Sequence, residues 1–202
     1  MALCLSLLIG VGACSEEEIA YSAGEENKEV ILQLNCQLQT NQEVIVSRAS
    51  TAENRLNDLH FYVFNAAGEL TGYKKLVATE SSPIPTPGPE TVTVKAITGE
   101  AYIYALANLN STIYYLDDAD KNKLTGIDEA DVAGSSLTRD EFLAIDFKRQ
   151  YGNASHIISP NPTDGQFMMS GYLNGGKAVT ITAGTNGAGV ISESNVIRLY
   201  RI

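Results

Sequence analysis

EVILQLNCQLQT, residues 29–40, alternates apolar and polar side chains through most of its length. Its apolar set is Val30, Leu32, Leu34, Cys36 and Leu38, and the polar set between them is Gln33, Asn35, Gln37 and Gln39. Successive side chains of a β-strand point to opposite faces. The pattern therefore predicts a strand with one buried face, in which Cys36 behaves as a small buried hydrophobe.

Further β-type runs follow along the chain, and Gly, Pro or Asn turns separate them. Strands are expected at 44–46, 60–64, 70–77, 91–96, 101–108, 167–171, 177–182 and 196–202. The run at 101–108 is the most apolar of these and is expected to be the most buried strand. Residues 65–69 read as a turn, and the four prolines within 81–89 exclude a helix or a central strand there.

One helix signal stands out from these β-type runs. Thr138 and Glu141 have the spacing of a capping box, and Phe142 and Leu143 follow, so a short helix is expected near 138–148. Many short strands with one or two minor helices indicate an all-β sandwich. A length of 202 residues allows one or two domains.

The composition excludes several classes of function. The net charge is −10 and the pI is about 4.6, so no basic patch is expected to neutralise phosphates, and nucleic acid is not an expected partner. The two histidines, His60 and His156, lie in unrelated contexts. Because no HExxH, phosphate loop or nucleophile motif is present, neither an enzyme nor a cofactor is predicted.

The N-terminal segment has the features of a lipoprotein signal. An apolar run from Leu3 to Val11 precedes Gly12-Ala13-Cys14, and the run is too short to span a bilayer. Cys14 is therefore the expected lipidation site and first mature residue, with an ordinary signal peptide as the alternative. No Lys or Arg precedes the run, which indicates that the true start lies upstream. Once Cys4 is removed and Cys14 lipidated, Cys36 has no disulfide partner.

Two other residue sets have the composition of ligand sites. Asp118, Asp120, Asn122 and Glu129 match positions 1, 3, 5 and 12 of a calcium-binding EF-hand loop, but Lys123 occupies the position that requires Gly. An acidic, solvated loop is the favoured interpretation, and no metal is predicted. The pairs Tyr102/Tyr104 and Tyr114/Tyr115 offer either a ligand face or packing against a sheet, and packing is the commoner use.

The order of these segments resembles the fimbrillin family, the type V pilins and related fimbrial lipoproteins of Gram-negative anaerobes. The resemblance rests on the lipobox, the acidic tether, the alternating strand and Ser47-Arg48-Ala49-Ser50. Further support comes from three later segments, namely 57–68, 101–108, and 169–171 with 179–181. It covers most of residues 14–202 as an ordered arrangement rather than one signature.

The resemblance implies two β-sandwich domains of transthyretin-like topology, of which this chain would hold the first. It implies export as a lipoprotein to the outer membrane and cleavage by an arginine-specific protease between Arg48 and Ala49. The expected layout is a signal peptide at 1–13, a tether at 14–28, a removable strand segment at 29–48, a sandwich at 49–195 and the start of a second domain at 196–202. The uncapped apolar run at 196–202 indicates a truncated chain.

The predicted function is that of a structural fimbrial subunit that serves cell adhesion. Removing 29–48 would leave an apolar groove that a strand of another subunit fills. An ordinary exposed arginine is the alternative interpretation of Arg48. The alternative functions are a non-polymerising surface lipoprotein that binds glycans or nutrients, and a secreted enzyme whose catalytic half lies beyond Ile202.

Overall fold

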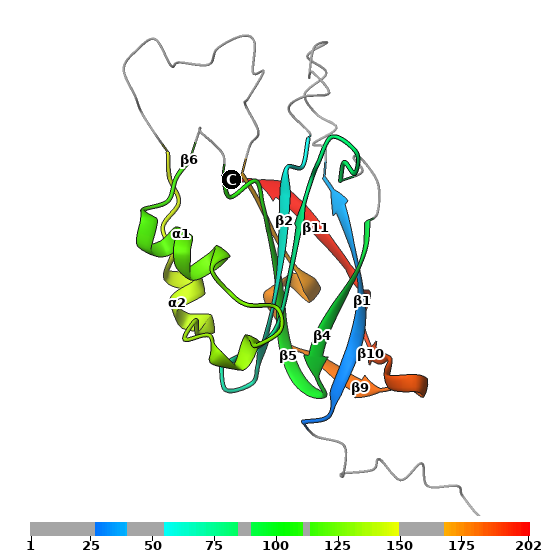
Figure 1. Cartoon of the computed structure of the whole chain (residues 1–202). Helices are drawn as coiled ribbons and strands as arrows, with labels where there is room; N and C mark the ends of the chain where they lie inside the picture. The colour runs from blue at the N-terminus through cyan, green and yellow to red at the C-terminus, as the bar shows by residue number, and fades with distance from the viewer. Residues whose placement is uncertain (1–26, 40–54, 85–89, 111–113, 150–167) are drawn as a thin grey trace, which may run out of the picture.

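The computed structural model describes residues 27–39, 55–84, 90–110, 114–149 and 168–202 (Figure 1). Its strands are β1 (Glu29–Leu38), β2 (Asp58–Asn65), β3 (Leu70–Val77), β4 (Glu90–Ile97), β5 (Gly99–Ala107), β6 (Tyr114–Tyr115), β7 (Lys148–Arg149), β8 (Met169–Tyr172), β9 (Val179–Ala183), β10 (Gly189–Ile191) and β11 (Val196–Arg201). Its helices are α1 (Asp118–Thr125), α2 (Arg139–Ala144) and the 3₁₀ turns η1 (Val132–Gly134), η3 (Leu173–Gly176) and η4 (Thr185–Gly187).

A single hydrogen-bonded sheet curls around the core and forms both layers of a sandwich (Figure 1). From one end to the other, the strands run β3-β2-β5-β8-β11-β1-β4, and β9-β10 branches from the start of β5. β6 and β7 form a separate two-stranded ribbon. The predicted all-β sandwich is confirmed, as are the strands expected within the described ranges; the run at 44–46 lies outside them.

The apolar interior of the sandwich is built from alternate residues of nearly every strand. β1, β2, β4, β5 and β11 contribute most of its buried side chains, including Leu34, Phe61, Val94, Ile103 and Leu199. Burial of each Val, Leu, Ile or Phe side chain is worth about 1.5–3 kcal/mol relative to exposure. This shared interior means that no layer of the sandwich has a core of its own.

A second apolar cluster lies between the outer face of β2, β3 and β5 and the segment that carries α1 and α2. Tyr62, Phe64, Tyr104 and Phe142 pack there with ring centroids 4.9–6.1 Å apart. As a result β2 is buried on both faces, at seven of its eight positions. Residues 101–108 are also buried at seven of eight positions, so the deeply buried strand expected there is found, and β2 equals it.

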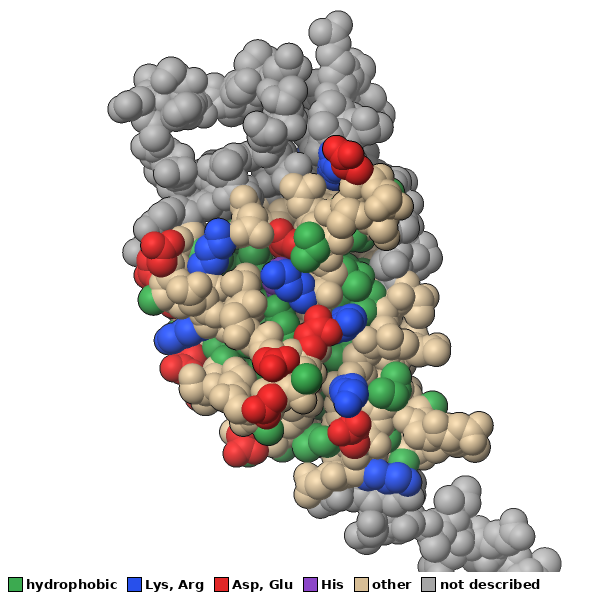
Figure 2. Space-filling model, in the orientation of Figure 1, with side chains coloured by type: hydrophobic (Ala, Val, Ile, Leu, Met, Phe, Trp, Pro, Cys, Tyr) green, Lys and Arg blue, Asp and Glu red, His purple; other side chains and the backbone are tan. Residues whose placement is uncertain are grey.

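The middle of the chain contains the two α-helices, and only α2 was expected from the sequence. The capping box is confirmed, because Thr138 and Glu141 exchange both predicted hydrogen bonds at the start of α2, although the helix ends at Ala144. Residues 118–125 form helix α1, capped by Asp117, where a solvated loop was expected. Figure 2 shows basic and acidic side chains interspersed on the face of the molecule that these helices occupy.

The EF-hand-like spacing does not produce an EF-hand loop. Asp118, Asp120 and Asn122 lie within helix α1, so their side chains do not converge as ligands of a loop would. Glu129 binds elsewhere, with its carboxylate 2.7 Å from Lys74 Nζ and 2.9 Å from the backbone nitrogen of Lys75. Burial would raise the pKa of Glu129, but these partners hold it below its usual value.

The sandwich closes where β3 approaches β4 at Gly72. A Cβ added to Gly72 would lie 2.2 Å from the carbonyl oxygen of Lys95, so only glycine allows the two strands to approach this closely. We expect Gly72→Ala to lower the free energy of unfolding by about 3 kcal/mol, since the strands must separate. Urea denaturation followed by circular dichroism measures this change.

Gly187→Ala is the control for the Gly72 substitution. Gly187 has a φ of +76°, but an added Cβ meets no atom within 4 Å, so only the backbone strain of about 1 kcal/mol is expected. Equal losses of stability for the two variants would show that the β3–β4 approach is not tight.

Candidate functional site

The strand β1 occupies a slot between β4 and β11, one strand in from the end of the sheet (Figure 1). Along one edge it pairs antiparallel with β4, from Glu29 opposite Ile97 to Cys36 opposite Glu90. Along the other it pairs parallel with β11, from Asn35 opposite Val196 to Leu38 opposite Leu199. An isolated parallel bridge from Ile31 to Ala188 adds contact beside β10. β1 is thus enclosed on both hydrogen-bonding edges.

The inward face of β1 carries the side chains that the sequence singled out as a strand and groove set. Val30, Leu32, Leu34, Cys36 and Leu38 are all buried in the interior, and the alternation along the strand is confirmed. Cys36 is buried, as expected. At Gly189 an added Cβ would lie 2.6 Å from Leu32 Cδ2, so the floor of the slot fits closely around β1.

The outward face of β1 is held by polar contacts. The Asn35 carboxamide oxygen accepts a hydrogen bond from Thr91 Oγ1 at 2.8 Å, and the Asn195 carboxamide nitrogen donates to the carbonyl of Gln33 at 3.0 Å. Glu29 forms an exposed ion pair with Lys95 at 3.4 Å, of the kind that contributes little to stability. Apolar burial and main-chain pairing therefore provide most of the attachment of β1.

Removal of β1 would open a groove with a defined shape. The inner edges of β4 and β11 would present unpaired N–H and C=O groups, and such edges are templates for another strand. Between these edges, the inward side chains of β4 and β11, among them Val94 and Leu199, would lose their cover. An incoming strand would need small or medium apolar residues at every second position.

The covalent connection of β1 to the remaining sandwich passes through residues 40–54. Arg48 and Ala49, the predicted cleavage pair, belong to this segment and lie outside the described residues, as does Cys14. β1 makes no ladder with β2, the next strand described along the chain. A break within 40–54 would therefore leave every described hydrogen bond of β1 intact.

A buried polar cluster at the start of β2 was not predicted. Asp58, His60 and Tyr73 are buried, with His60 Nδ1 2.8 Å from the Tyr73 hydroxyl and His60 Nε2 3.3 Å from Asp58 Oδ1. The latter contact is close but lacks hydrogen-bond geometry. Asp58 Oδ1 also accepts from the Leu109 backbone nitrogen at 2.8 Å. Asp58 and His60 lie two positions apart on one face of the strand, and this spacing was the signal from which the cluster could have been predicted.

Electrostatics within this cluster follow from its burial. Burial favours the neutral form of Asp58, but contact with His60 and the Leu109 N–H group outweigh it, so the pKa of Asp58 lies below its usual 3.8. Burial, with the nearby Glu129 and Asp58 charges, raises the pKa of Tyr73 and keeps its hydroxyl neutral. The cluster joins β2 and β3 to the chain after β5, which indicates a structural role.

The tyrosines considered as a ligand face are used mainly for packing. Tyr104 is buried, and its hydroxyl accepts a hydrogen bond from Arg139 Nε at 2.9 Å. The Arg139 guanidinium lies 3.8 Å from the centre of the Tyr102 ring. These contacts fix α2 on the sheet. The backbones of Tyr114 and Tyr115 form β6, and their side chains lie outside the description.

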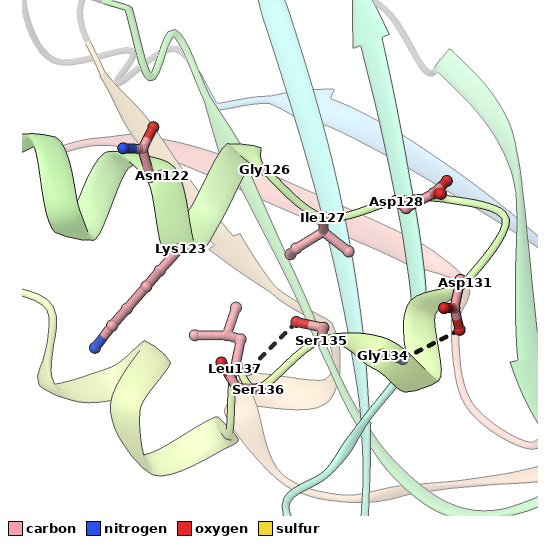
Figure 3. A pocket seen from close by; sticks show the side chains of 10 residues that line it. All are labelled: Asn122, Lys123, Gly126, Ile127, Asp128, Asp131, Gly134, Ser135, Ser136 and Leu137. Carbon is pink, nitrogen blue, oxygen red and sulfur yellow. Dashed lines mark hydrogen bonds between the residues drawn. The ribbon is translucent and has the colours of Figure 1, made fainter.

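A polar hollow of about 320 Å³ lies between α1 and η1 (Figure 3). Asp128 and Asp131 line it, but each accepts a hydrogen bond from a nearby backbone nitrogen, that of Ala130 and Gly134 respectively. Within the described ranges, no group of three or more His, Cys, Asp or Glu residues is placed to hold a metal ion. No described helix is long and apolar enough to cross a membrane.

The family of the chain follows from comparison with known proteins. The model of the major fimbrial subunit protein (FimA) family matches residues 33–201. The chain belongs to this family. The match begins within β1 and ends at the last residue of β11, so it includes the part of β1 that pairs with β11 and the whole of β11. No curated protein sequence matches the chain.

Solved structures support the fold of a FimA-family protein. The tip fimbrial protein Mfa3 of Porphyromonas gingivalis, in a C-terminally truncated form, aligns with a TM-score of 0.51 and 18% identity over 86% of this chain and 48% of that one. A putative cell adhesion protein of Parabacteroides distasonis aligns with a TM-score of 0.45 and 17% identity, over 85% of this chain and 45% of that one. The fimbrial anchor protein Mfa2 of P. gingivalis aligns with a TM-score of 0.42 and 12% identity, over 84% of this chain and 49% of that one. The chain thus spans about half the length of these structures.

Proposed function

We propose that this FimA-family chain is a structural fimbrial subunit that assembles by β-strand addition and serves cell adhesion. In this proposal it is exported through its 1–13 signal, lipidated at Cys14 and tethered to the outer membrane by 14–28. An arginine-specific protease then cleaves between Arg48 and Ala49. The partners are other fimbrial subunits, and no catalytic step or cofactor is required.

The observation that carries the proposal is the placement of β1. It fills the slot between β4 and β11, and its covalent route to the sandwich passes through the segment that contains Arg48. Cleavage would convert β1 from a covalent part of the fold into a bound ligand. The fragment that ends at Arg48 and contains β1 would be released, and the sandwich from Ala49 onward would keep the groove between β4 and β11.

Exchange would proceed through the edges of β4 and β11. A strand of another subunit would pair with both edges as β1 does, and main-chain hydrogen bonds would supply its affinity. Apolar side chains at every second position would set its register, since a shift by one residue would turn the polar face inward. Because β11 pairs with β1 and β8 and contributes Ile197 and Leu199 to the interior, it belongs to this sandwich, and the second domain is proposed to begin after β11 rather than at 196.

Digestion of the folded full chain by an arginine-specific protease tests this mechanism. We expect a new N-terminus at Ala49 by intact mass and N-terminal sequencing. We then expect a labelled peptide of residues 29–40, added in excess, to enter the cleaved protein but not the uncleaved one. Alkylation mapped to Cys36 reports release of β1, since this thiol is buried while β1 is in place.

Two pairs of controls make the result interpretable. Arg48→Gln is expected to prevent cleavage, whereas Arg55→Gln, at an exposed arginine next to the described sandwich, leaves it unchanged. A peptide with Leu34→Asp is expected not to enter the groove. If residues 29–40 stay bound after cleavage and no peptide is incorporated, the strand-exchange mechanism is wrong. That result would favour the alternative function of a non-polymerising surface lipoprotein.

A further inference from the structure

The outer face of β8 and β11 carries side chains that the fold does not use. Tyr172 on β8 and Tyr200 on β11 are 49% and 44% exposed, which is unusual for large aromatic side chains in a folded domain. Both strands bury their alternate residues, including Met169, Ile197 and Leu199, so the exposed rings lie on the opposite face. The rings therefore contribute to neither apolar cluster.

Strand register brings these side chains together. Arg198 of β11 lies directly opposite Tyr172 of β8, and Tyr200 is the diagonal neighbour of Tyr172 on the same face. Gly171 allows this close pairing, because an added Cβ would lie 2.5 Å from the carbonyl oxygen of Arg198. The result is an arginine placed beside two exposed tyrosine rings on a paired, regular part of the sheet.

The loops at the end of these strands complete a hollow of about 320 Å³. Glu193 and Asn174 line it together with Tyr172, Arg198 and Tyr200. Asn174 has a φ of +48° and donates through its carboxamide nitrogen to the Ala178 carbonyl at 3.2 Å, which leaves its carboxamide oxygen free to accept. The hollow therefore combines aromatic surface with fixed polar groups, as ligand sites usually do.

The charged groups of the hollow have no partner among the residues that the structure describes. Neither the guanidinium of Arg198 nor the carboxylate of Glu193 forms a hydrogen bond or ion pair with any residue that the structure describes. Arginine binds carboxylates through two parallel hydrogen bonds, and lysine does not reproduce that geometry. Arg198 is the one cationic residue among those that line the hollow, and its unpaired guanidinium points to an anionic ligand group.

We propose that this hollow binds an acidic saccharide, a glycan that carries a carboxylate. The apolar face of a sugar ring would stack on Tyr172 or Tyr200, and the carboxylate would bind Arg198. The carboxylate of Glu193 and the carboxamide oxygen of Asn174 would accept hydrogen bonds from sugar hydroxyls. The inference goes beyond strand exchange, because it requires only that β8 and β11 are folded.

Titration of the full chain with 3′-sialyllactose and with a glucuronate-containing hyaluronan tetrasaccharide, followed by calorimetry or ligand-observed NMR, tests the site. Lactose is the neutral counterpart. We expect saturable binding of at least one acidic glycan and binding of lactose at least tenfold weaker. The affinity should fall as salt is raised, since an exposed charge pair is screened.

Variants locate the binding. Arg198→Gln is expected to lower the affinity for the acidic glycan at least tenfold. Tyr172→Ala and Tyr200→Ala are each expected to lower it about tenfold. Lys177→Gln and Leu143→Ala are matched controls, because they remove an exposed charge and an exposed apolar side chain outside the hollow. These controls should bind as the parent does.

Three results would overturn the proposal: no binding of either acidic glycan, equal binding of lactose, or binding that the Arg198 and tyrosine variants leave unchanged. Peptide incorporation into the cleaved protein is measured separately. Failure of the glycan site therefore leaves strand exchange untouched, and failure of strand exchange leaves the glycan site untouched.

Discussion

Leu34→Asp is expected to leave the full chain without a stable folded state, whereas Gln33→Asp folds like the parent. Leu34 is fully buried at the middle of β1, in contact with the interior that both layers share. A carboxylate there would have no partner, and the expected loss is about 5 kcal/mol or more. That is comparable with the whole stability of a typical domain.

Urea denaturation and size-exclusion chromatography measure the effect. Gln33 is the matched control, because it is the adjacent residue, lies exposed on the opposite face and receives the same new charge. Its substitution should change stability by about 0.5 kcal/mol or less. If Leu34→Asp cannot be purified, Leu34→Ala should fold with a loss of about 3–5 kcal/mol. Equal stability of the two aspartate variants would show that β1 does not complete the core.

Asp58→Ala is expected to lower the free energy of unfolding by about 3 kcal/mol. The substitution would leave the buried Leu109 N–H group without its acceptor and would remove the carboxylate that lies 3.3 Å from His60 Nε2. Tyr73→Phe, which removes only the hydroxyl bound to His60, should cost about 1 kcal/mol. Asp128→Asn is the control, because its carboxylate lies on the surface.

The contribution of Asp58 also depends on pH. Its pKa in the folded protein is lowered, so the folded state favours the ionised form. The stability that this provides is fully present above the unfolded value near 3.8 and is lost as the pH falls through the lower folded value. The difference in stability between the parent and Asp58→Asn should therefore be constant from about pH 5 to 8 and shrink below about pH 4. A difference that does not vary with acid would contradict the ionised assignment.

Much of the fold could be predicted because its strands follow simple local rules. The alternation at 29–40 gave both the strand and its buried face, and Thr138 with Glu141 located the start of α2. The β2–β3 hairpin was readable from the turn around Gly68, whose φ of +82° requires glycine or its equivalent. In each case the signal lies within a dozen neighbouring residues.

The remaining features depend on contacts that a local pattern cannot encode. α1 has a polar, weakly amphipathic sequence and is held by tertiary contact, with Leu124 buried and its carbonyl bound to the Tyr62 hydroxyl at 2.9 Å. The double burial of β2 results from α1 and α2 covering its outer face. The Tyr172–Arg198–Tyr200 arrangement depends on the register between β8 and β11, which no short stretch reveals.

The parallel pairing of β1 with β11 has a consequence for the timing of folding. Asn35 pairs with Val196, so the contact that seals the slot joins positions 161 residues apart. Contacts of such long range form late, because the entropy of closing a large loop is lost before the contacts contribute any stabilisation. During folding, the slot is therefore expected to stay open until residues 196–199 dock. Until then, the edge of β1 that later pairs with β11 is unpaired and open to the strand of another chain.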